Sequence, residues 1–303
     1  MEFGQLPLEQ LDKTDFTLPP DSNFNKDLFS KQSPSAHPLI RVGCAKWGRK
    51  EWVGKIYPPG TKEADFLQHY VKHFNSIELN ATSYKVYGPD TIGKWAAAAT
   101  GKDFLFSPKM PNSLSNLGSG VTEQVEAITN RFINGIRAFG EHLGPVFLLT
   151  GDHFSPAKKD NLYAYLKILP KDIQFFVEVR HHGWYDNKEA GEEYFSTLRD
   201  LNIGAVITDT AGRRDCLHMQ LPIAKTFIRF VGNNLHPTDY SRLDQWVERV
   251  KSWMQQGLQE LYFFMHHTEE RESPELCDYF IERLNKECNT TLSRPEFLTM
   301  SNA

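Results

Sequence analysis

The sequence contains few cysteines, and their spacing excludes two common kinds of small-domain scaffold. Only four occur among 303 residues, and no two of them form a C-x-x-C pair. Zinc ribbons need such pairs, and disulfide frameworks need a much higher density of cysteine. We therefore expect neither a structural zinc site nor a disulfide scaffold. The four cysteines are Cys44, Cys216, Cys277 and Cys288.

An excess of basic charge and a long apolar run are also missing. The 34 Lys and Arg residues are outnumbered by 38 Asp and Glu residues, which gives a formal charge of −4. This balance does not provide the broad electrostatic attraction of non-specific nucleic-acid binding. No stretch approaches the roughly 18 apolar residues of a membrane-spanning helix, and residues 1–4 do not begin a signal peptide. We expect no membrane partner and a cytoplasmic location.

Glycine-rich phosphate loops are absent as well. Neither G-x-G-x-x-G nor G-x-x-x-x-G-K-[ST] occurs, which disfavours an open, doubly wound nucleotide-binding sheet. The chain instead has eight short apolar runs, most of them nearly continuous, as is typical of parallel strands covered on both faces. The predicted strands are residues 39–45, 76–80, 104–109, 146–150, 174–180, 204–209, 226–231 and 260–266.

Amphipathic stretches alternate with these strands and predict a TIM-like (β/α)8 barrel, with a single domain over residues 39–290. Residues 1–38 are polar and proline-punctuated, which predicts an N-terminal extended arm with little regular structure. We expect its removal to change stability only modestly. Residues 291–303 form a C-terminal tail, and residues 215–224 show no convincing helix. The predicted helices are 63–74, 89–100, 122–143, 158–169, 189–201, 240–256 and 274–288.

Charged residues and aromatic residues lie at the carboxyl ends of several predicted strands, where barrel enzymes place their active sites. Charges within apolar runs are expensive to bury unless they are paired or functional. The catalytic candidates are Glu78, Glu178, Asp209 and His181. The ligand-binding candidates are Trp47, Asn80, Tyr84, Lys109, Arg180, Trp184, Arg229 and His266.

Each candidate also has a purely structural interpretation. Glu78 and Arg229 can form an ion pair inside the barrel, as can Glu178 and Arg180, which share side-chain parity on one strand. His181 and the adjacent histidine can be solvent-exposed loop residues. Lys109 can be a solvated lysine at the rim of the barrel. The aromatic residues of segment 47–58 can close the barrel mouth rather than stack on a ligand.

A metal site is the next alternative. Glu78, Glu178, Asp209 and His266 come from four strands, an arrangement also used by metal-dependent isomerases and endonucleases built on barrels. No H-E-x-x-H or comparable local spacing is present, and the neighbouring cations compete for the carboxylates. We therefore assign no metal ligands and no cofactor from the sequence.

Four motifs together resemble the YecE-like family, also called domain of unknown function 72. They are W-x4-W-x-G-x-x-Y-P over 47–58, E-x-N-x-[TS]-x-Y over 78–84, Lys109, and V-E-x-R-H-x-x-W over 177–184. The resemblance extends from about Arg41 to beyond His266 and implies a TIM-like barrel, but it supplies no reaction. The chain departs from the family pattern at Leu149, where Q-L-P-P is usual, at Val231, which replaces a histidine, and at Met265 and His266, which replace asparagines.

The leading hypothesis is an enzyme that acts on a small anionic or polyhydroxylated ligand at the barrel mouth, of hydrolase or isomerase type. Lys109, Arg180 and Arg229 would supply cationic donors, and Glu78 and Glu178 are acid/base candidates. A nucleic-acid-binding barrel is less favoured, although segment 47–58 interleaves basic and aromatic residues. A non-catalytic ligand-binding barrel is the remaining alternative. The sequence does not predict an oligomeric state.

Overall fold

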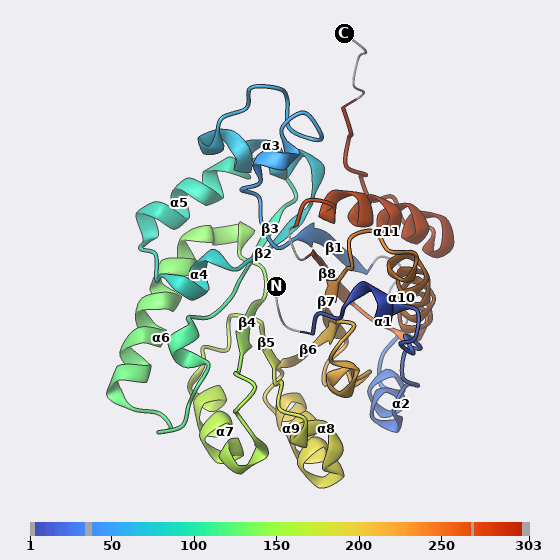
Figure 1. Ribbon diagram of the computed structural model, residues 1–303. Coiled ribbons are helices and arrows are strands. Elements are labelled where there is room, and N and C mark those ends of the chain that lie inside the picture. Colours follow the sequence, from blue (N-terminus) through green and yellow to red (C-terminus); the bar gives the residue numbers. More distant parts are fainter. Residues whose placement is uncertain (1–3, 34–37, 268–269, 299–303) are drawn as a thin grey trace.

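Eight parallel strands and the helices around them form one α/β domain in the computed structural model (Figure 1). The structure describes residues 4–33, 38–267 and 270–298. All eight predicted strands are confirmed, with ends that differ from the prediction by at most two residues. The strands are β1 (Leu39–Cys44), β2 (Ser76–Leu79), β3 (Leu105–Pro108), β4 (Val146–Leu149), β5 (Phe175–Glu178), β6 (Gly204–Asp209), β7 (Lys225–Val231) and β8 (Glu260–His266).

The strands are hydrogen-bonded in two groups. A six-stranded sheet has the order β1-β8-β7-β6-β5-β4, and β2 pairs with β3. Between β1 and β2 the Tyr70 side chain replaces part of a ladder, since Cys44 N–H donates to its hydroxyl (2.7 Å), which donates to Ser76 C=O (2.9 Å). Between β3 and β4, Met110 N–H donates to Phe147 C=O (2.9 Å). This parallel α/β arrangement is consistent with the TIM-like fold expected from the sequence.

The helices cover the outside of the strands (Figure 1). The predicted helix over 122–143 ends as an α-helix at Ile136 and continues as a 3-10 helix over Arg137–His142. None of the described helices is long and apolar enough to cross a membrane. The α-helices after β1 are α3 (Phe66–His73), α4 (Ala81–Tyr84), α5 (Pro89–Ala98), α6 (Glu123–Ile136), α7 (Lys159–Ile168), α8 (Gly183–Asp186), α9 (Lys188–Asp200), α10 (Pro237–Gln256) and α11 (Ser273–Cys288).

The segment before β1 contains two short helices, α1 (Leu8–Leu11) and α2 (Asn23–Phe29), which the sequence did not predict. It begins at the carboxyl end of β6, where the Gly4 carbonyl accepts hydrogen bonds from Thr210 Oγ1 (2.9 Å) and Gly212 N–H (2.7 Å). The segment then continues along the outside of the domain. Leu11 is fully buried in this stretch, so the segment is part of the packed structure rather than a loose arm.

Helix α2 lies between α9 and α10. The Arg199 guanidinium of α9 lies 4.4 Å from the Phe24 ring centroid, and Arg249 of α10 donates to the Asp21 carboxylate (3.1 Å). This position corresponds to a crossover helix between β6 and β7. All of residues 210–224 are described, and they contain only a three-residue 3-10 turn, Arg214–Cys216. Helix α2 therefore takes the place of the missing crossover helix.

The Asn25 side chain joins α2 to the segment that follows β6. Its amide donates to Met219 C=O (2.5 Å), and its carbonyl oxygen accepts from Leu221 N–H (2.8 Å). Asn25 is 1% exposed, so these two bonds satisfy backbone groups in a place with little access to water. Helices α1 and α2 were not expected within residues 1–38, and these contacts favour a larger loss of stability on removal of the segment than the modest change predicted from the sequence.

The interior of the strand arrangement has an aromatic layer on which the charged residues lie. Phe147, Phe176 and Phe227 come from β4, β5 and β7, and their rings pack together with Tyr262 and Phe264 of β8. Because side chains alternate along a strand, residues two positions nearer the carboxyl ends also face inward. Those positions on β5 and β7 hold Glu178 and Arg229, which begin the candidate site.

Candidate functional site

An ion-pair network occupies the interior at the carboxyl ends of the strands. The Arg229 Nε and one terminal nitrogen donate to the two Glu78 carboxylate oxygens, each at 2.9 Å. Its other terminal nitrogen donates to Glu178 Oε2 at 2.7 Å. All three side chains are at most 2% exposed. One arginine thus joins carboxylates from β2 and β5, as the structural interpretation of the sequence had allowed.

Neighbouring cations favour the ionised form of both carboxylates. Burial by itself raises the pKa of Glu78, but the Arg229 and His266 charges outweigh it and hold that pKa well below its usual value. Burial also opposes ionisation of Glu178, while Arg180 and then Arg229 lower its pKa to about 2. Ionised carboxylates accept protons and hydrogen bonds, but they do not donate protons. Neither glutamate therefore has the protonation state of a general acid near neutral pH.

Further side chains extend the network at both ends. Arg180 Nε donates to Glu178 Oε1 (2.6 Å), and Asn80 donates to Glu78 Oε1 (2.8 Å). His266 Nε2 lies 2.7 Å from Glu78 Oε2. Four strands therefore contribute to one continuous group, and the structure brings together six of the predicted site residues. They are Glu78, Asn80, Glu178, Arg180, Arg229 and His266.

Glu270 also lies beside this network, and the sequence analysis missed it. Its carboxylate is 3.7 Å from His266 Nδ1 and accepts a hydrogen bond from Ser273 Oγ (2.8 Å). Burial raises the pKa of Glu270, and the interaction with His266 partly offsets this increase. Glu270 has a φ of 59°, a backbone conformation that is unfavourable for residues other than glycine. It follows β8 outside any apolar run, so no sequence signal indicated it.

Lys109 directly follows β3 and faces the same interior. It forms an isolated bridge with Phe147, whose ring belongs to the interior aromatic layer, and parallel partners in register point to the same side. Partial burial is the main reason that its pKa is lowered to about 8, and the Arg229 charge adds to this effect. Glu78 and Glu178 oppose the shift. Among the described residues, no hydrogen bond or ion pair involves the Lys109 ammonium group.

Two buried hydroxyl groups flank the network without a hydrogen-bond partner in the described part of the chain. They belong to Ser107 of β3 and Thr208 of β6. Ser107 is in register with Glu78, and Thr208 is in register with Arg229, so both point into the interior. A buried hydroxyl with no partner is unfavourable, and such groups commonly bond to water or a ligand. The sequence analysis did not select either residue.

Two predicted site residues point away from this interior. Asp209 is fully buried against α10, where it accepts hydrogen bonds from Arg242 (2.9 Å) and Trp246 Nε1 (2.7 Å). The Trp184 ring lies in the core, and its Nε1 donates to Phe154 C=O (2.7 Å). Their proposed catalytic and ligand-binding roles therefore do not agree with their positions.

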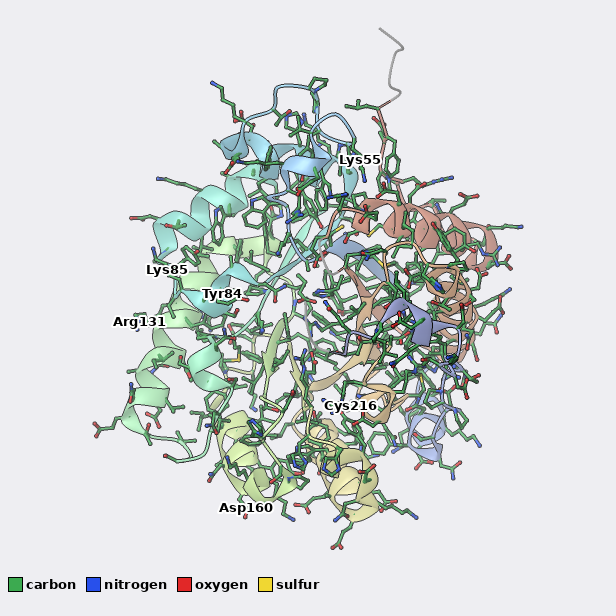
Figure 2. The ribbon with its side chains drawn as sticks, in the orientation of Figure 1. Lys55, Tyr84, Lys85, Arg131, Asp160 and Cys216 are labelled. Atoms are coloured by element: carbon green, nitrogen blue, oxygen red, sulfur yellow. The ribbon has the colours of Figure 1, made fainter. Side chains whose placement is uncertain are left out.

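Three other candidates lie at the periphery of the site. Tyr84 of α4 is 81% exposed and extends outward (Figure 2). His181 stacks on His182, with ring centroids 4.5 Å apart, and its Nδ1 accepts a hydrogen bond from Gly183 N–H. Trp47 packs edge-on against Trp95 of α5 at 5.4 Å. In the part of the chain that the structure describes, none of the three bonds to the ion-pair network.

Segment 47–58 packs mainly as core. Trp52 and Tyr57 are fully buried, with Trp52 Nε1 donating to Glu270 C=O (3.1 Å) and the Tyr57 hydroxyl donating to Trp47 C=O (2.9 Å). Lys55 pairs with Glu275 at 2.6 Å. These contacts favour the interpretation that the segment closes the end of the domain, and they leave little of it available as a stacking platform.

The predicted four-residue metal set does not come together. Asp209 points toward α10, while Glu78 and Glu178 direct their carboxylates at Arg229. Within residues 4–33, 38–267 and 270–298, no three His, Cys, Asp or Glu side chains are grouped so that they could hold a metal ion. The described side chains of this site present arginine, lysine, carboxylate, imidazole and hydroxyl groups.

Comparison with known proteins identifies the family. The model of "Protein of unknown function DUF72" matches residues 41–298. The UPF0759 protein YecE of Escherichia coli K12 is 24% identical over 266 residues, which are 82% of this chain and 93% of YecE. A DUF72 family protein from Enterococcus faecalis V583 superimposes in two crystal structures with TM-scores of 0.65 and 0.61, at 15% identity, over 85% and 86% of this chain and all of that one. The chain belongs to the DUF72 family.

Proposed function

We propose that the chain is a closed TIM-like barrel and that the carboxyl ends of its strands bind a small ligand with an anionic group and several hydroxyl groups. We further propose that the protein is an enzyme of isomerase type. Barrel closure is supported by the hydrogen bonds of Tyr70 between β1 and β2 and of Met110 between β3 and β4. Active sites of barrel enzymes lie at this end of the strands.

The balance of charge in the interior is the observation that carries the proposal. The negative charges of Glu78 and Glu178 are matched by the positive charges of Arg180 and Arg229, which contact them directly. The remaining carboxyl group, Glu270, lies beside His266, and burial raises its pKa. Protonated Lys109 then adds a positive charge that has no carboxylate bonded to it in the described residues. A partly buried cation of this kind favours an anionic group, because the surroundings screen charge weakly.

Polar groups for the rest of the ligand lie around this charge. The Ser107 and Thr208 hydroxyls have no protein partner among the described residues, and each can donate one hydrogen bond and accept others. Ligand hydroxyls would satisfy them. A polyhydroxylated anion, such as a sugar phosphate or a hydroxy acid, therefore fits the site better than an apolar molecule does.

The protonation states favour isomerase chemistry over hydrolysis. Hydrolysis assisted by a pair of glutamates uses one of them as a proton donor, whereas Glu78 and Glu178 have lowered pKa values. Lys109, whose pKa is lowered to about 8, is a group that can exchange protons near neutral pH. Moving a proton within a substrate needs such a group. A barrel that binds the same ligand without turnover remains the second candidate, and an assay for product separates the two.

A thermal-shift screen tests the binding proposal. Sugar phosphates, nucleotides and hydroxy acids are compared with neutral apolar compounds on the intact protein, the Lys109→Met variant and a control variant, Lys188→Met, whose ammonium is on the surface of α9. A ligand at 100 times its Kd stabilises the folded state by about 2.7 kcal/mol, so we expect a rise in melting temperature of about 5 °C.

The expected pattern is a shift with anionic ligands in the intact protein and in the control, and a smaller shift in Lys109→Met. Without ligand, the Lys109→Met variant should be at least as stable as the intact protein, because it removes a partly buried charge. Stabilisation by neutral apolar compounds alone, equal in all three proteins, would overturn the proposal. Binding that weakens steeply with salt and requires an oligonucleotide would favour a nucleic-acid-binding barrel instead.

A further inference from the structure

We propose that Lys109 is a nucleophile, whose side-chain amine forms an imine with a carbonyl group of the ligand. The substrate class is then an aldehyde or ketone that also carries an anionic group. This inference rests on the proposed function, since it places the ligand in the same interior site. It adds a covalent role to a residue that the sequence analysis considered only as a cationic donor.

The position of the Lys109 amine is the first observation that supports imine formation. Lys109 follows β3 on the interior side, beside Phe147 and near the charges of Glu78, Glu178, Arg180 and Arg229. Each of those carboxylates already accepts hydrogen bonds from an arginine. The amine therefore has carboxylates nearby and yet bonds to none of them, which leaves its lone pair available when it loses a proton.

The protonation state of the Lys109 amine also favours imine formation. A lysine needs an uncharged amine to attack a carbonyl carbon. Burial and the Arg229 guanidinium lower the Lys109 pKa to about 8, so about half of the amines are uncharged at pH 8, compared with well under one in a hundred for an ordinary lysine. This combination of geometry and charge is typical of imine-forming lysines.

Other lysines of the chain differ from Lys109 in their ion pairs and in the direction of their pKa shifts. Lys159 forms an ion pair with Glu193 at 2.5 Å, and Lys50 forms one with Glu63 at 2.8 Å. In both cases the hydrogen bond that the lysine donates to the glutamate raises the lysine pKa. These two amines remain charged up to higher pH and are poor nucleophiles. A reagent that needs the uncharged amine should therefore select Lys109 over both.

The chemical step is balanced without any other reactant. The Nζ lone pair forms a bond to the carbonyl carbon, the C=O π electrons move to oxygen, and a proton moves from nitrogen to that oxygen to give a carbinolamine. Loss of water then gives the imine, so the sum is carbonyl plus amine to imine plus water. Protonation of the imine gives an iminium cation, which the ionised Glu78 and Glu178 carboxylates stabilise.

The iminium also connects this step to the proposed isomerase chemistry. It withdraws electrons from the adjacent carbon and makes the proton on that carbon easier to remove. The iminium nitrogen restores the positive charge at Lys109, and the anionic group of the substrate offsets that charge. The Ser107 and Thr208 hydroxyls bond to hydroxyl groups of the substrate. The two hydroxyls thereby gain hydrogen-bond partners, which no other described residue supplies.

Reductive trapping on the full-length protein tests the inference. The probe is glyceraldehyde 3-phosphate with sodium borohydride, which reduces an imine to a stable secondary amine, and the modified peptides are identified by mass spectrometry. Neutral glyceraldehyde serves as the comparison without the anionic group. The expected result is labelling of Lys109 at least tenfold above Lys159 and Lys50, half-maximal near pH 8, and weaker with neutral glyceraldehyde.

Two variants sharpen the test. Lys109→Met should lose the label, and the matched control Lys159→Met should keep it. Labelling that follows surface exposure, with Lys109 unmodified in the intact protein, would overturn the inference even if the variant failed to fold. If anionic ligands raise the melting temperature and Lys109 is not trapped, imine formation is wrong and ligand binding stands. If no anionic ligand shifts the melting temperature, the proposed function itself is wrong.

Discussion

The ion pairs of Glu78 and Glu178 with Arg229 determine how much each of these buried residues contributes to stability. All three groups are nearly inaccessible to water, and each would be unfavourable without the others. Removing one partner of a buried ion pair typically costs about 3–5 kcal/mol, because the remaining charge is left without compensation. Glu178 therefore stabilises the fold by compensating the buried charge of Arg229, whether or not it also contacts a ligand.

We predict that Glu178→Gln destabilises the protein by about 2–4 kcal/mol at pH 7, since it leaves Arg229 and Arg180 with an uncharged partner. The intact protein should also lose stability as the pH falls. The Glu178 pKa is about 2 in the folded state against an ordinary value of 4.5, so its stabilisation is complete above pH 4.5 and decreases as the pH falls toward 2. Urea denaturation at a series of pH values measures both effects.

A matched control is Glu193→Gln, which removes the surface partner of Lys159. Surface pairs contribute about 0–1 kcal/mol, so this variant should remain close to the intact protein and keep its acid dependence. In Glu178→Gln, by contrast, the decrease in the free energy of unfolding between pH 4.5 and pH 2 should be smaller by about 3 kcal/mol. An unchanged acid dependence in Glu178→Gln would mean that other carboxylates determine the acid stability.

Side-chain parity explains which site residues could be predicted from the sequence. Glu178 and Arg180 share a parity, and the structure brings both to the network. Asp209 ends β6, but it is the neighbouring Thr208 that is in register with Arg229 and faces inward. A charged residue at the end of a predicted strand shows that it lies at the carboxyl ends of the strands. It does not show whether the side chain faces the interior or the outer helices. The face depends on the register between strands, which the sequence does not show.

At the scale of elements, the most unusual feature is that α2, from the beginning of the chain, replaces a crossover helix. The sequence correctly predicted that residues 215–224 form no regular helix, since they lack a helical period. It could not predict the replacement, because α2 has only seven residues and is too short for a period to be recognised. By contrast, the strands are long enough and apolar enough to be found from the sequence alone.

The Asn25 contacts give a prediction for this element. Asn25→Ala leaves the Met219 carbonyl and the Leu221 amide without their side-chain partner. Each unsatisfied buried group costs about 1–3 kcal/mol, so we expect a loss of about 2–4 kcal/mol in the free energy of unfolding. Chemical denaturation followed by circular dichroism measures it. Asn23→Ala, an exposed position on the same helix, is the control and should change stability by less than about 1 kcal/mol. Equal effects of the two substitutions would contradict the assigned role of Asn25.

At the scale of the whole molecule, residues 4–33 tie the carboxyl ends of the strands to the outer helices. The segment buries Leu11, Phe16, Leu18 and Phe29, each at most 7% exposed. Burying a side chain of this type contributes about 1.5–3 kcal/mol. The combined contribution is comparable with the total stability of a typical domain, which is about 5–15 kcal/mol. The parallel α/β architecture was predictable from the alternation of strands and helices, whereas this long-range packing was not.

We predict that deleting residues 1–33 lowers the melting temperature by more than about 10 °C or abolishes cooperative unfolding, because the β6–β7 region loses its covering helix. Deleting residues 1–7 alone keeps Leu11 and all of α2, so it should have a much smaller effect. Thermal unfolding monitored by circular dichroism distinguishes the two truncations. A 1–33 deletion with an unchanged transition would show that α2 is dispensable for folding.

The position of α2 also has a consequence for the order of events during translation. Asn25 pairs with a residue 196 positions later, and Asp21 pairs with one 228 positions later. At about 5–20 residues per second, the ribosome completes those partners on the order of 10–45 s after α2 has been synthesised. For most of that interval, until Phe195 and Arg199 of α9 have been synthesised, the Phe24 ring lacks the two side chains that it contacts in the folded domain. Helix α2 thus leaves the ribosome long before the residues that hold it in place, so it is among the last elements to complete its packing.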